Sequence, residues 1–204
     1  MICLLGGTFD PIHYGHLRPA HEAMEALGCT TLHVIPAAQP PHRPAPVASA
    51  AQRERMVELA VAEFPGFRAD DRELRRGGLS YSVLTLESLR AEYAQQPLCL
   101  LLGVDAFLGF ESWHRWQDIL DLTHLVVLTR PGWTLQTMAG WARERSGDKD
   151  MLSRCAAGHL FFLSVTPQHI SATELRAALA QGGTVHGLLP EAVWEFICQN
   201  KIYR

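Results

Sequence analysis

Residues 2–16 read ICLLGGTFDPIHYGH, and this stretch decides the fold. It starts with a short apolar run, turns at Gly6 and Gly7, and leads into a segment with helical spacing of its apolar residues. An apolar run bounded by glycine indicates a buried strand, and glycines let the backbone turn sharply and approach a ligand. The first turn of the helix that follows has unpaired N–H groups and a partial positive charge. The stretch therefore predicts a strand, a tight turn and a helix start that attracts an anion.

The same alternation continues along the chain. Further apolar runs occupy residues 32–35, 98–102, 124–128 and 160–163, and the run LCLLL at 98–102 is continuous, as in a strand covered on both faces. Helical spacing appears at Leu17, Ala20, Met24 and Leu27, at Met56, Leu59 and Ala60, at Val83, Leu86 and Leu89, at Leu175, Ala178 and Leu179, and at Leu189, Val193 and Ile197. Strands that alternate with helices predict an α/β fold, a doubly wound parallel sheet in three layers, with ligands at the carboxyl ends of its strands.

Length and composition limit the classes of protein. The chain has 204 residues, 48% of them hydrophobic and 19% charged, which predicts a single folded domain over residues 1–204. A net charge of −3 gives no basic excess for nucleic acid, and we find no apolar run long enough to span a membrane. Residues 36–46 carry five prolines and predict a stiff loop, whereas residues 133–158 predict a surface helix and connection.

The five cysteines are widely spaced and form no C-x-x-C motif. Their odd number and spacing argue against a disulfide framework or a zinc site. We therefore expect a protein of the reducing cytoplasm.

Two histidines define the first candidate site. His13 and His16 are three residues apart at the predicted turn and helix start, so both imidazoles can face the same space. A histidine pair beside a helix N-terminus suits a phosphate whose charge grows during a reaction. Two surface histidines in an ordinary connection are the structural alternative, and a metal site would need a third ligand. The stretch matches neither a P-loop nor the G-x-G-x-x-G fingerprint of dinucleotide-binding proteins.

A second candidate site follows the last apolar run. Ser171 and Glu174 have the spacing of a capping box, which predicts that Ser171 is the N-cap of a helix. Thr173 and Arg176 then lie on its first two turns, where a hydroxyl, free N–H groups and a guanidinium can hold a polyphosphate. An ordinary capped helix with a solvated arginine is the structural alternative.

Both stretches resemble the signatures of the nucleotidyltransferase superfamily with the H-x-G-H motif. Residues 6–16 match G-G-T-F-D-P-x-H-x-G-H, and residues 170–176 match I-S-[ST]-T-x-x-R except that Ala172 stands where the family usually has serine or threonine. The resemblance implies a Rossmann-like nucleotidyltransferase fold, with His16 and His13 as catalytic residues. It also implies an ATP site made of Gly6, Gly7, Thr8, Phe9, His13, His16, Gly103, Asp105, Ile170, Ser171, Thr173 and Arg176. For Asp105, a plain helix cap would give the same pattern.

The rest of the chain is similar to the bacterial nicotinate-nucleotide adenylyltransferases. The matching stretches are residues 40–43, 71–74, 80–82, 103–105, 113–116, 130–132 and the tail; Arg43, Ser82 and Leu84 stand where lysine, threonine and often aspartate are usual. The resemblance implies transfer of the adenylyl group of ATP to nicotinate mononucleotide, a step of NAD biosynthesis. It places the nicotinate nucleotide at His42, Arg43, Tyr81, Ser82, Trp113 and Arg130. Trp113 offers an aromatic face for the pyridine ring, and the helix start at Tyr81 and Ser82 offers N–H groups for its carboxylate.

The sequence leaves two alternatives to this function open. The acceptor could be nicotinamide mononucleotide or phosphopantetheine, or the protein could be a nucleotide-binding sensor without turnover, which Ala172 suggests. We expect Mg²⁺ to arrive with ATP and no metal site of the protein's own. The expected partners are small-molecule substrates, with no nucleic acid and no membrane, and a homo-oligomer is left open. We interpret Trp194 and Tyr203 as packing residues.

Overall fold

The structure, a computed structural model, describes residues 1–41, 44–133 and 140–204. Six strands form one sheet in the order β3-β2-β1-β4-β5-β6. Their bounds are β1 Ile2–Gly7, β2 Thr31–Pro36, β3 Phe67–Ala69, β4 Leu98–Gly103, β5 His124–Thr129 and β6 Leu160–Ser164. The sheet is parallel and flanked by helices, so the predicted doubly wound α/β fold is confirmed.

The helices begin and end close to the predicted patterns. Their bounds are α1 Tyr14–Leu27, α2 Ala50–Val61, α3 Arg72–Arg76, α4 Ser82–Glu92, α5 Val104–Leu108, the 3₁₀ helix η1 Phe110–Ser112, α6 Trp116–Leu122, α7 Gly140–Arg145, α8 Lys149–Arg154, α9 Ala172–Ala180 and α10 Glu191–Gln199. The five helical spacings of the sequence correspond to α1, α2, α4, α9 and α10. The others are too short to show a periodicity.

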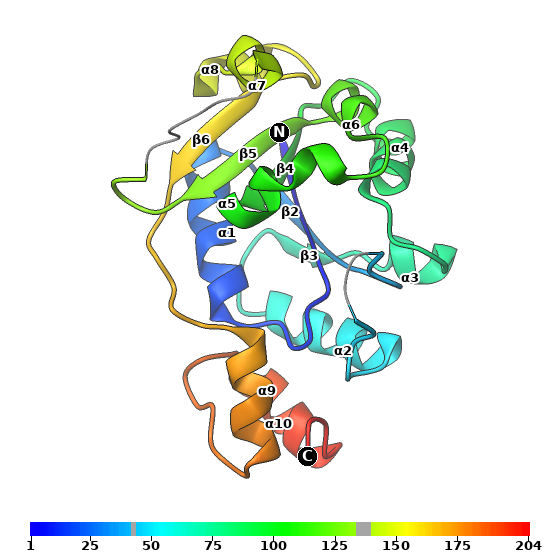
Figure 1. Cartoon of the computed structure of the whole chain (residues 1–204), viewed down its shortest axis with the longest axis vertical. Coiled ribbons are helices and arrows are strands. Elements are labelled where there is room, and N and C mark those ends of the chain that lie inside the picture. The colour runs from blue at the N-terminus through cyan, green and yellow to red at the C-terminus, as the bar shows by residue number, and fades with distance from the viewer. Residues whose placement is uncertain (42–43, 134–139) are drawn as a thin grey trace. The chain divides into compact units, whose positions relative to one another are not determined.

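The predicted strands are present, and a sixth joins them. The five apolar runs correspond to β1, β2, β4, β5 and β6, and residues 98–102 are all buried, as expected of a strand covered on both faces. The additional strand β3 has three residues and buries Phe67 alone, so it gives no apolar run to detect. In the register of β1 and β4, Cys3 lies beside Cys99. Figure 1 shows β5 and β6 as neighbouring strands that run in the same direction, and β4 pairs with β5 in parallel.

The strand order changes direction between β1 and β4. Such a reversal is a topological switch point, and doubly wound sheets bind their ligands at the carboxyl ends of the strands there. The connection that leaves β1 contains His13 of the first signature, and His16 follows in the first turn of α1. Topology therefore places this connection where a ligand is expected.

The chain forms two compact units. The first consists of Met1–Leu5, Glu22–Leu32 and Tyr81–Pro167, and the second of Gly6–His21, His33–Ser80 and Gln168–Arg204. Both signature stretches belong to the second unit. The single domain over residues 1–204 stays a prediction.

Two further properties concern the whole described chain. Within the described ranges, no helix combines the length and the apolar character that crossing a membrane requires. All five cysteines are free thiols, and Cys3, Cys29 and Cys99 are buried in the first unit.

Candidate active site

The first signature stretch has a tightly packed turn. Phe9 is buried and has φ +50°, a left-handed conformation that costs energy in a residue with a side chain. A Cβ at Gly7 would come within 2.8 Å of the Phe9 ring, so only glycine fits this close approach. At Gly6, in contrast, a Cβ would meet open space. Phe9 in turn presses against the edge of His16, with ring centroids 5.2 Å apart and planes at 88°.

The two histidines lie together as the sequence predicted. Their rings stack with centroids 3.8 Å apart and an interplanar angle of 27°. The backbone N–H of His13 donates to Nδ1 of His16 at 3.3 Å. Because an acceptor nitrogen carries no proton, a neutral His16 has its proton on Nε2. This hydrogen bond therefore makes Nε2 of His16 a donor.

His13 is the more buried of the two. Its exposed fraction is 4%, and its Nδ1 is buried without a hydrogen-bond partner among the described residues. Burial lowers the pKa of His13 to about 4, because it penalises the charged imidazolium. His13 is therefore a neutral imidazole at pH 7.

The two signature stretches meet at Gly15. A Cβ on Gly15 would lie 2.8 Å from the His13 ring and 3.1 Å from the backbone oxygen of Ile170. Such distances leave no room for a side chain, so glycine is required where the second stretch passes the first. Residues separated by more than 150 positions in sequence therefore form one site.

Arg176 makes a second connection between the stretches. Its Nη1 donates to the backbone oxygen of Asp10 at 2.7 Å and lies 4.0 Å from Oδ2 of the same residue. Its Nη2 approaches Oγ1 of Thr173 at 3.4 Å. The guanidinium side chain is 30% exposed, so it remains accessible to a ligand.

The helix of the second stretch starts where predicted, but the capping box is wrong. Ser171 is the N-cap of α9, yet its side chain makes no capping hydrogen bond. Its backbone has ψ 129°, whereas Ser49, which forms a complete capping box with Gln52 at the start of α2, has ψ 161°. Glu174 is exposed.

The first unit holds the other predicted residues that the structure describes. Gly103 ends β4 and is exposed, and Arg130 follows β5 directly and is also exposed. Strands β4 and β5 are parallel, and Gly103 lies beside Leu128. Gly103 and Arg130 therefore lie at the same edge of the sheet, where the two strands end. Asp105 is exposed in the first turn of α5, where Gly103 and not Asp105 is the N-cap.

Tyr81 and Ser82 lie at a helix start, as predicted. Tyr81 is the N-cap of α4 and Ser82 its first residue. The Tyr81 ring packs against His114 with centroids 4.4 Å apart, which brings it beside the segment that carries Trp113. Trp113 is half-buried against Phe110, at 5.5 Å between centroids. Trp116 contacts both Phe110 and Trp141, so it belongs to the same aromatic cluster.

His42 and Arg43, the remaining predicted contacts, lie outside the described residues.

No individual role follows from the sequence for three residues that shape the site, namely Asp10, Gly15 and Arg53, although the first two belong to the first signature. Arg53 is 1% exposed and donates to the backbone oxygens of Thr8, Ala37 and Ala38. A signal for it existed, because Arg53 shares the buried face of α2 with Met56, Val57 and Ala60. A charged residue on an apolar helix face indicates a buried polar network.

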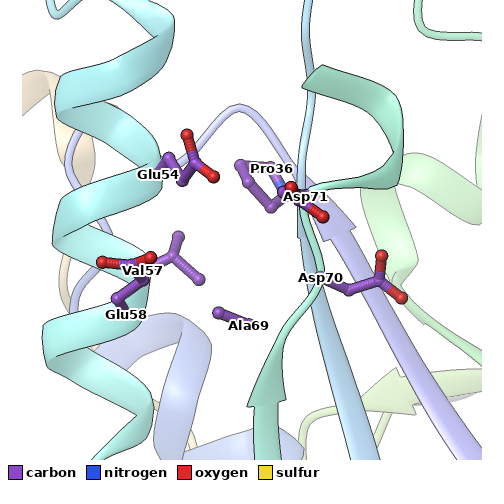
Figure 2. A pocket seen from close by; sticks show the side chains of 7 residues that line it. All are labelled: Pro36, Glu54, Val57, Glu58, Ala69, Asp70 and Asp71. Atoms are coloured by element: carbon purple, nitrogen blue, oxygen red, sulfur yellow. The ribbon is translucent and has the colours of Figure 1, made fainter. Parts of the chain in front are cut away.

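A separate small pocket of the second unit lies between α2 and β3 (Figure 2). It has a volume of about 110 Å³ and is lined by Pro36, Glu54, Val57, Glu58, Ala69, Asp70 and Asp71. Burial, together with Asp71, raises the pKa of Glu54. The Asp70 carboxylate points away from α2 and binds His33 and Arg72. Carboxylates repel a triphosphate, so this pocket does not suit a nucleotide.

The fold and the two signature stretches define the class of protein as a nucleotidyltransferase, and a family model described as cytidylyltransferase-like matches residues 4–178. Sequence comparison is more specific. A relative from Aeromonas hydrophila is 48% identical over 100% of this chain and 97% of its own length, and one from Methylococcus capsulatus is 45% identical over 100% and 99%. Both carry the name "Probable nicotinate-nucleotide adenylyltransferase". The chain belongs to the nicotinate-nucleotide adenylyltransferase family.

Solved structures agree on the fold. Plasmodium falciparum nicotinic acid mononucleotide adenylyltransferase complexed with NaAD has a TM-score of 0.74 at 14% identity, covering 99% of this chain and 96% of its own. A structure titled as a putative nicotinate-nucleotide adenylyltransferase from Vibrio parahaemolyticus has a TM-score of 0.65 at 14% identity, covering 100% and 94%. At these identities the likeness concerns the fold alone.

Proposed function

We propose that the protein transfers the adenylyl group of ATP to nicotinate mononucleotide, giving nicotinate adenine dinucleotide and pyrophosphate in NAD biosynthesis. The observation that carries this proposal is the meeting of the two signature stretches at Gly15 and Asp10. Imidazoles, helix N–H groups and a guanidinium thereby gather in one place, and they are the groups that bind a triphosphate. Membership of the family supplies the acceptor.

The proposed chemistry is a direct displacement. A phosphate oxygen of nicotinate mononucleotide attacks the α-phosphorus of ATP, and the bond to the β-phosphate oxygen breaks so that pyrophosphate leaves with the electron pair. No nucleophile of the protein takes part, because positioning and neutralisation of charge supply most of the rate enhancement in phosphoryl and nucleotidyl transfer.

His16 has the central role in this mechanism. Its Nε2–H, oriented by the bond from the His13 backbone to Nδ1, donates to the α-phosphate oxygen on which charge develops. His13 supports the stacked ring and, as a neutral group, offers a second polar edge without an added charge. Phe9 acts indirectly by holding His16 in place.

The remaining ATP contacts are of two kinds, to the phosphates and to the nucleoside. Ser171, Thr173 and Arg176 hold the β- and γ-phosphates, and Ser171 can do so because its hydroxyl makes no capping bond to α9. Backbone groups of Gly6, Gly7, Thr8 and Ile170 line the phosphate path. Gly103 and Asp105 contact the nucleoside, a role that rests on the family resemblance.

The acceptor contacts are proposed for His42, Arg43, Tyr81, Ser82, Trp113 and Arg130. Support comes from the aromatic pair Tyr81 and His114 beside Trp113, which offers flat faces for a pyridine ring. The N–H groups at the start of α4 suit the carboxylate of nicotinate.

We propose that Mg²⁺ binds together with ATP. Among the described residues, no group of three or more His, Cys, Asp or Glu side chains is placed to hold a metal ion. Asp10, the carboxylate of the first signature, already accepts hydrogen bonds from two backbone N–H groups and a hydroxyl. These residues fit a Mg²⁺ ion that is bound through the phosphate oxygens of ATP, because Mg²⁺ usually keeps several waters and has few protein ligands. Bound there, it neutralises phosphate charge.

The test is pyrophosphate release from ATP and Mg²⁺ with a panel of acceptors. We expect nicotinate mononucleotide to exceed nicotinamide mononucleotide and phosphopantetheine in kcat/KM. Preference for the amide would refute the choice of acceptor. Calorimetric ATP binding without pyrophosphate release from any acceptor would support the sensor instead.

The setting of the enzyme is part of the same proposal. We propose a cytoplasmic location and small-molecule substrates, with no nucleic-acid or membrane partner. The net charge of −3 and the five free thiols support this assignment.

A further inference from the structure

The penultimate residue of the chain is connected to the first signature stretch. The hydroxyl of Tyr203 donates to Oδ1 of Asp10 at 2.7 Å, and both residues are buried. The backbone of Tyr203 has φ +69°, an unfavourable conformation for a residue with a side chain. Burial, followed by the hydrogen bond to Asp10, raises the pKa of Tyr203, so the hydroxyl keeps its proton at neutral pH. Tyr203 is thus more than the packing residue that the sequence suggested.

Asp10 receives donors from three separate segments. Besides Tyr203, its carboxylate accepts from the N–H of Val47 at 2.8 Å and of Ala48 at 3.0 Å. Val47 and Ala48 directly follow the proline-rich residues 36–46. Arg176 approaches the same residue from the second signature stretch. Asp10 is therefore the residue at which four parts of the second unit are held together: its own stretch, the segments of Val47 and Tyr203 through its carboxylate, and that of Arg176 through its backbone oxygen.

The geometry of Arg176 depends on these donors. A carboxylate and a guanidinium left to themselves form a close, often bidentate pair. Here Nη1 of Arg176 stays 4.0 Å from Oδ2 and binds the backbone oxygen of Asp10 instead. Three neutral donors already satisfy the carboxylate, so it competes less strongly for the guanidinium. Arg176 remains aligned with Thr173 and free to turn its charge toward phosphate.

We propose that Tyr203 is a positioning residue for ATP. Its hydroxyl donates a hydrogen bond to the Asp10 carboxylate and so prevents Arg176 from forming a close ion pair with that carboxylate. The β- and γ-phosphates of ATP then meet a guanidinium whose charge is not already neutralised. This inference rests on the proposed function for the role of Arg176, and the acceptor plays no part in it.

The direct test is the substitution Tyr203→Phe, which removes the hydroxyl and keeps the ring. We expect the calorimetric Kd for Mg-ATP to rise about threefold to tenfold, as for a lost hydrogen bond to a charged group that acts through a second residue. In turnover, KM for ATP rises by the same factor while KM for nicotinate mononucleotide stays unchanged. In the reverse reaction, KM for pyrophosphate rises as well.

Trp141→Phe is the matched control. Trp141 also donates a side-chain hydrogen bond to a carboxylate, Oε1 of Glu111 at 2.8 Å, and neither residue is a proposed substrate contact. We expect its Kd for Mg-ATP to equal that of the wild type. Equal increases in both variants, or increases in both KM values of Tyr203→Phe together with a lower Tm, would indicate a structural role and overturn the proposal.

A double-mutant cycle tests the pathway through Arg176. In an Arg176→Gln background, Tyr203→Phe should leave the Kd for Mg-ATP unchanged, because residues that act together are not additive. A full additional increase would refute the coupling, as would an unchanged Kd in Tyr203→Phe alone. These are binding measurements, so a protein that binds ATP but releases no pyrophosphate refutes the proposed function and still tests this inference.

Discussion

The two signature stretches reach the same place by different structural means. In the first stretch, Phe9, Asp10 and His13 are all buried, with exposed fractions of 2%, 6% and 4%. In the second, Thr173 and Glu174 are exposed and Arg176 is 30% exposed. The first stretch is fixed by its surroundings, whereas the second is attached to it through few contacts and keeps its polar groups accessible.

This difference suits the two kinds of phosphate charge that the proposed site has to stabilise. Charge that develops on the α-phosphate during transfer is best stabilised by donors that need no rearrangement. Charge on the β- and γ-phosphates is present before the reaction, and an accessible arginine can adjust to it on binding. We therefore expect changes in the first stretch to lower kcat, and changes in the second to raise KM for ATP.

The largest effect is expected from His16→Ala. Removal of the oriented Nε2–H should lower kcat about 100-fold to 1000-fold, as for loss of one preorganised donor, with little change in the Kd for ATP. Steady-state pyrophosphate release and calorimetry measure the two quantities. His186→Ala is the control, because His186 is an exposed residue beside Glu191 and should keep wild-type kcat. Near wild-type turnover in His16→Ala would remove His16 from the mechanism.

His13 predicts a pH dependence of stability for the fixed stretch. Its pKa is about 4 in the folded protein and about 6.5 in an unfolded chain, so the unfolded state binds more protons between these values. The contribution to stability is complete above pH 6.5 and is lost as the pH falls to 4. It amounts to about 3 kcal/mol over this range.

Urea unfolding at a series of pH values measures this effect. The free energy of unfolding of the wild type should fall more steeply between pH 6.5 and 4 than that of His13→Gln, which has no group to titrate there. Other titrating groups affect both proteins, so the difference isolates His13. Parallel curves would show that His13 is not held neutral by burial.

The sequence predicted the local parts of this site and one ATP site shared by the two signature stretches, but not the individual contacts that join them. The histidine spacing and the start of α9 are local patterns, and both are present. The turn predicted at Gly6 and Gly7 is wrong, because both glycines belong to β1 and the turn follows at Asp10 and Pro11. The capping box predicted at Ser171 is absent, although Ser171 is the N-cap of α9. The requirement for glycine at Gly15 arises in part from Ile170, which is distant in sequence and whose backbone oxygen passes close by.

Tyr203 and Arg53 show the same limit for buried polar groups. Asp10 and Tyr203 are 193 positions apart, and no spacing rule joins them. Arg53 could have been noticed on the apolar face of α2, but its acceptors are backbone oxygens, which no side-chain pattern reveals. Likewise, β3 has too few residues to give a periodic pattern. The fold is thus easier to predict than the hydrogen bonds that hold its active site.

The smallest effect is expected at Ala172, the first residue of α9, where the family usually has a hydroxyl. Ala172→Ser adds one hydrogen-bonding group to the accessible stretch and should lower KM for ATP about twofold to threefold, the net value of one hydrogen bond exchanged with water. Because this stretch acts on charge that is already present, kcat should not change. Ala177→Ser, exposed on the same helix but farther from its N-terminus, is the control and should have wild-type KM. A change in kcat for Ala172→Ser would show that the second stretch also acts in the transition state, and the division of work between the two stretches would then be wrong.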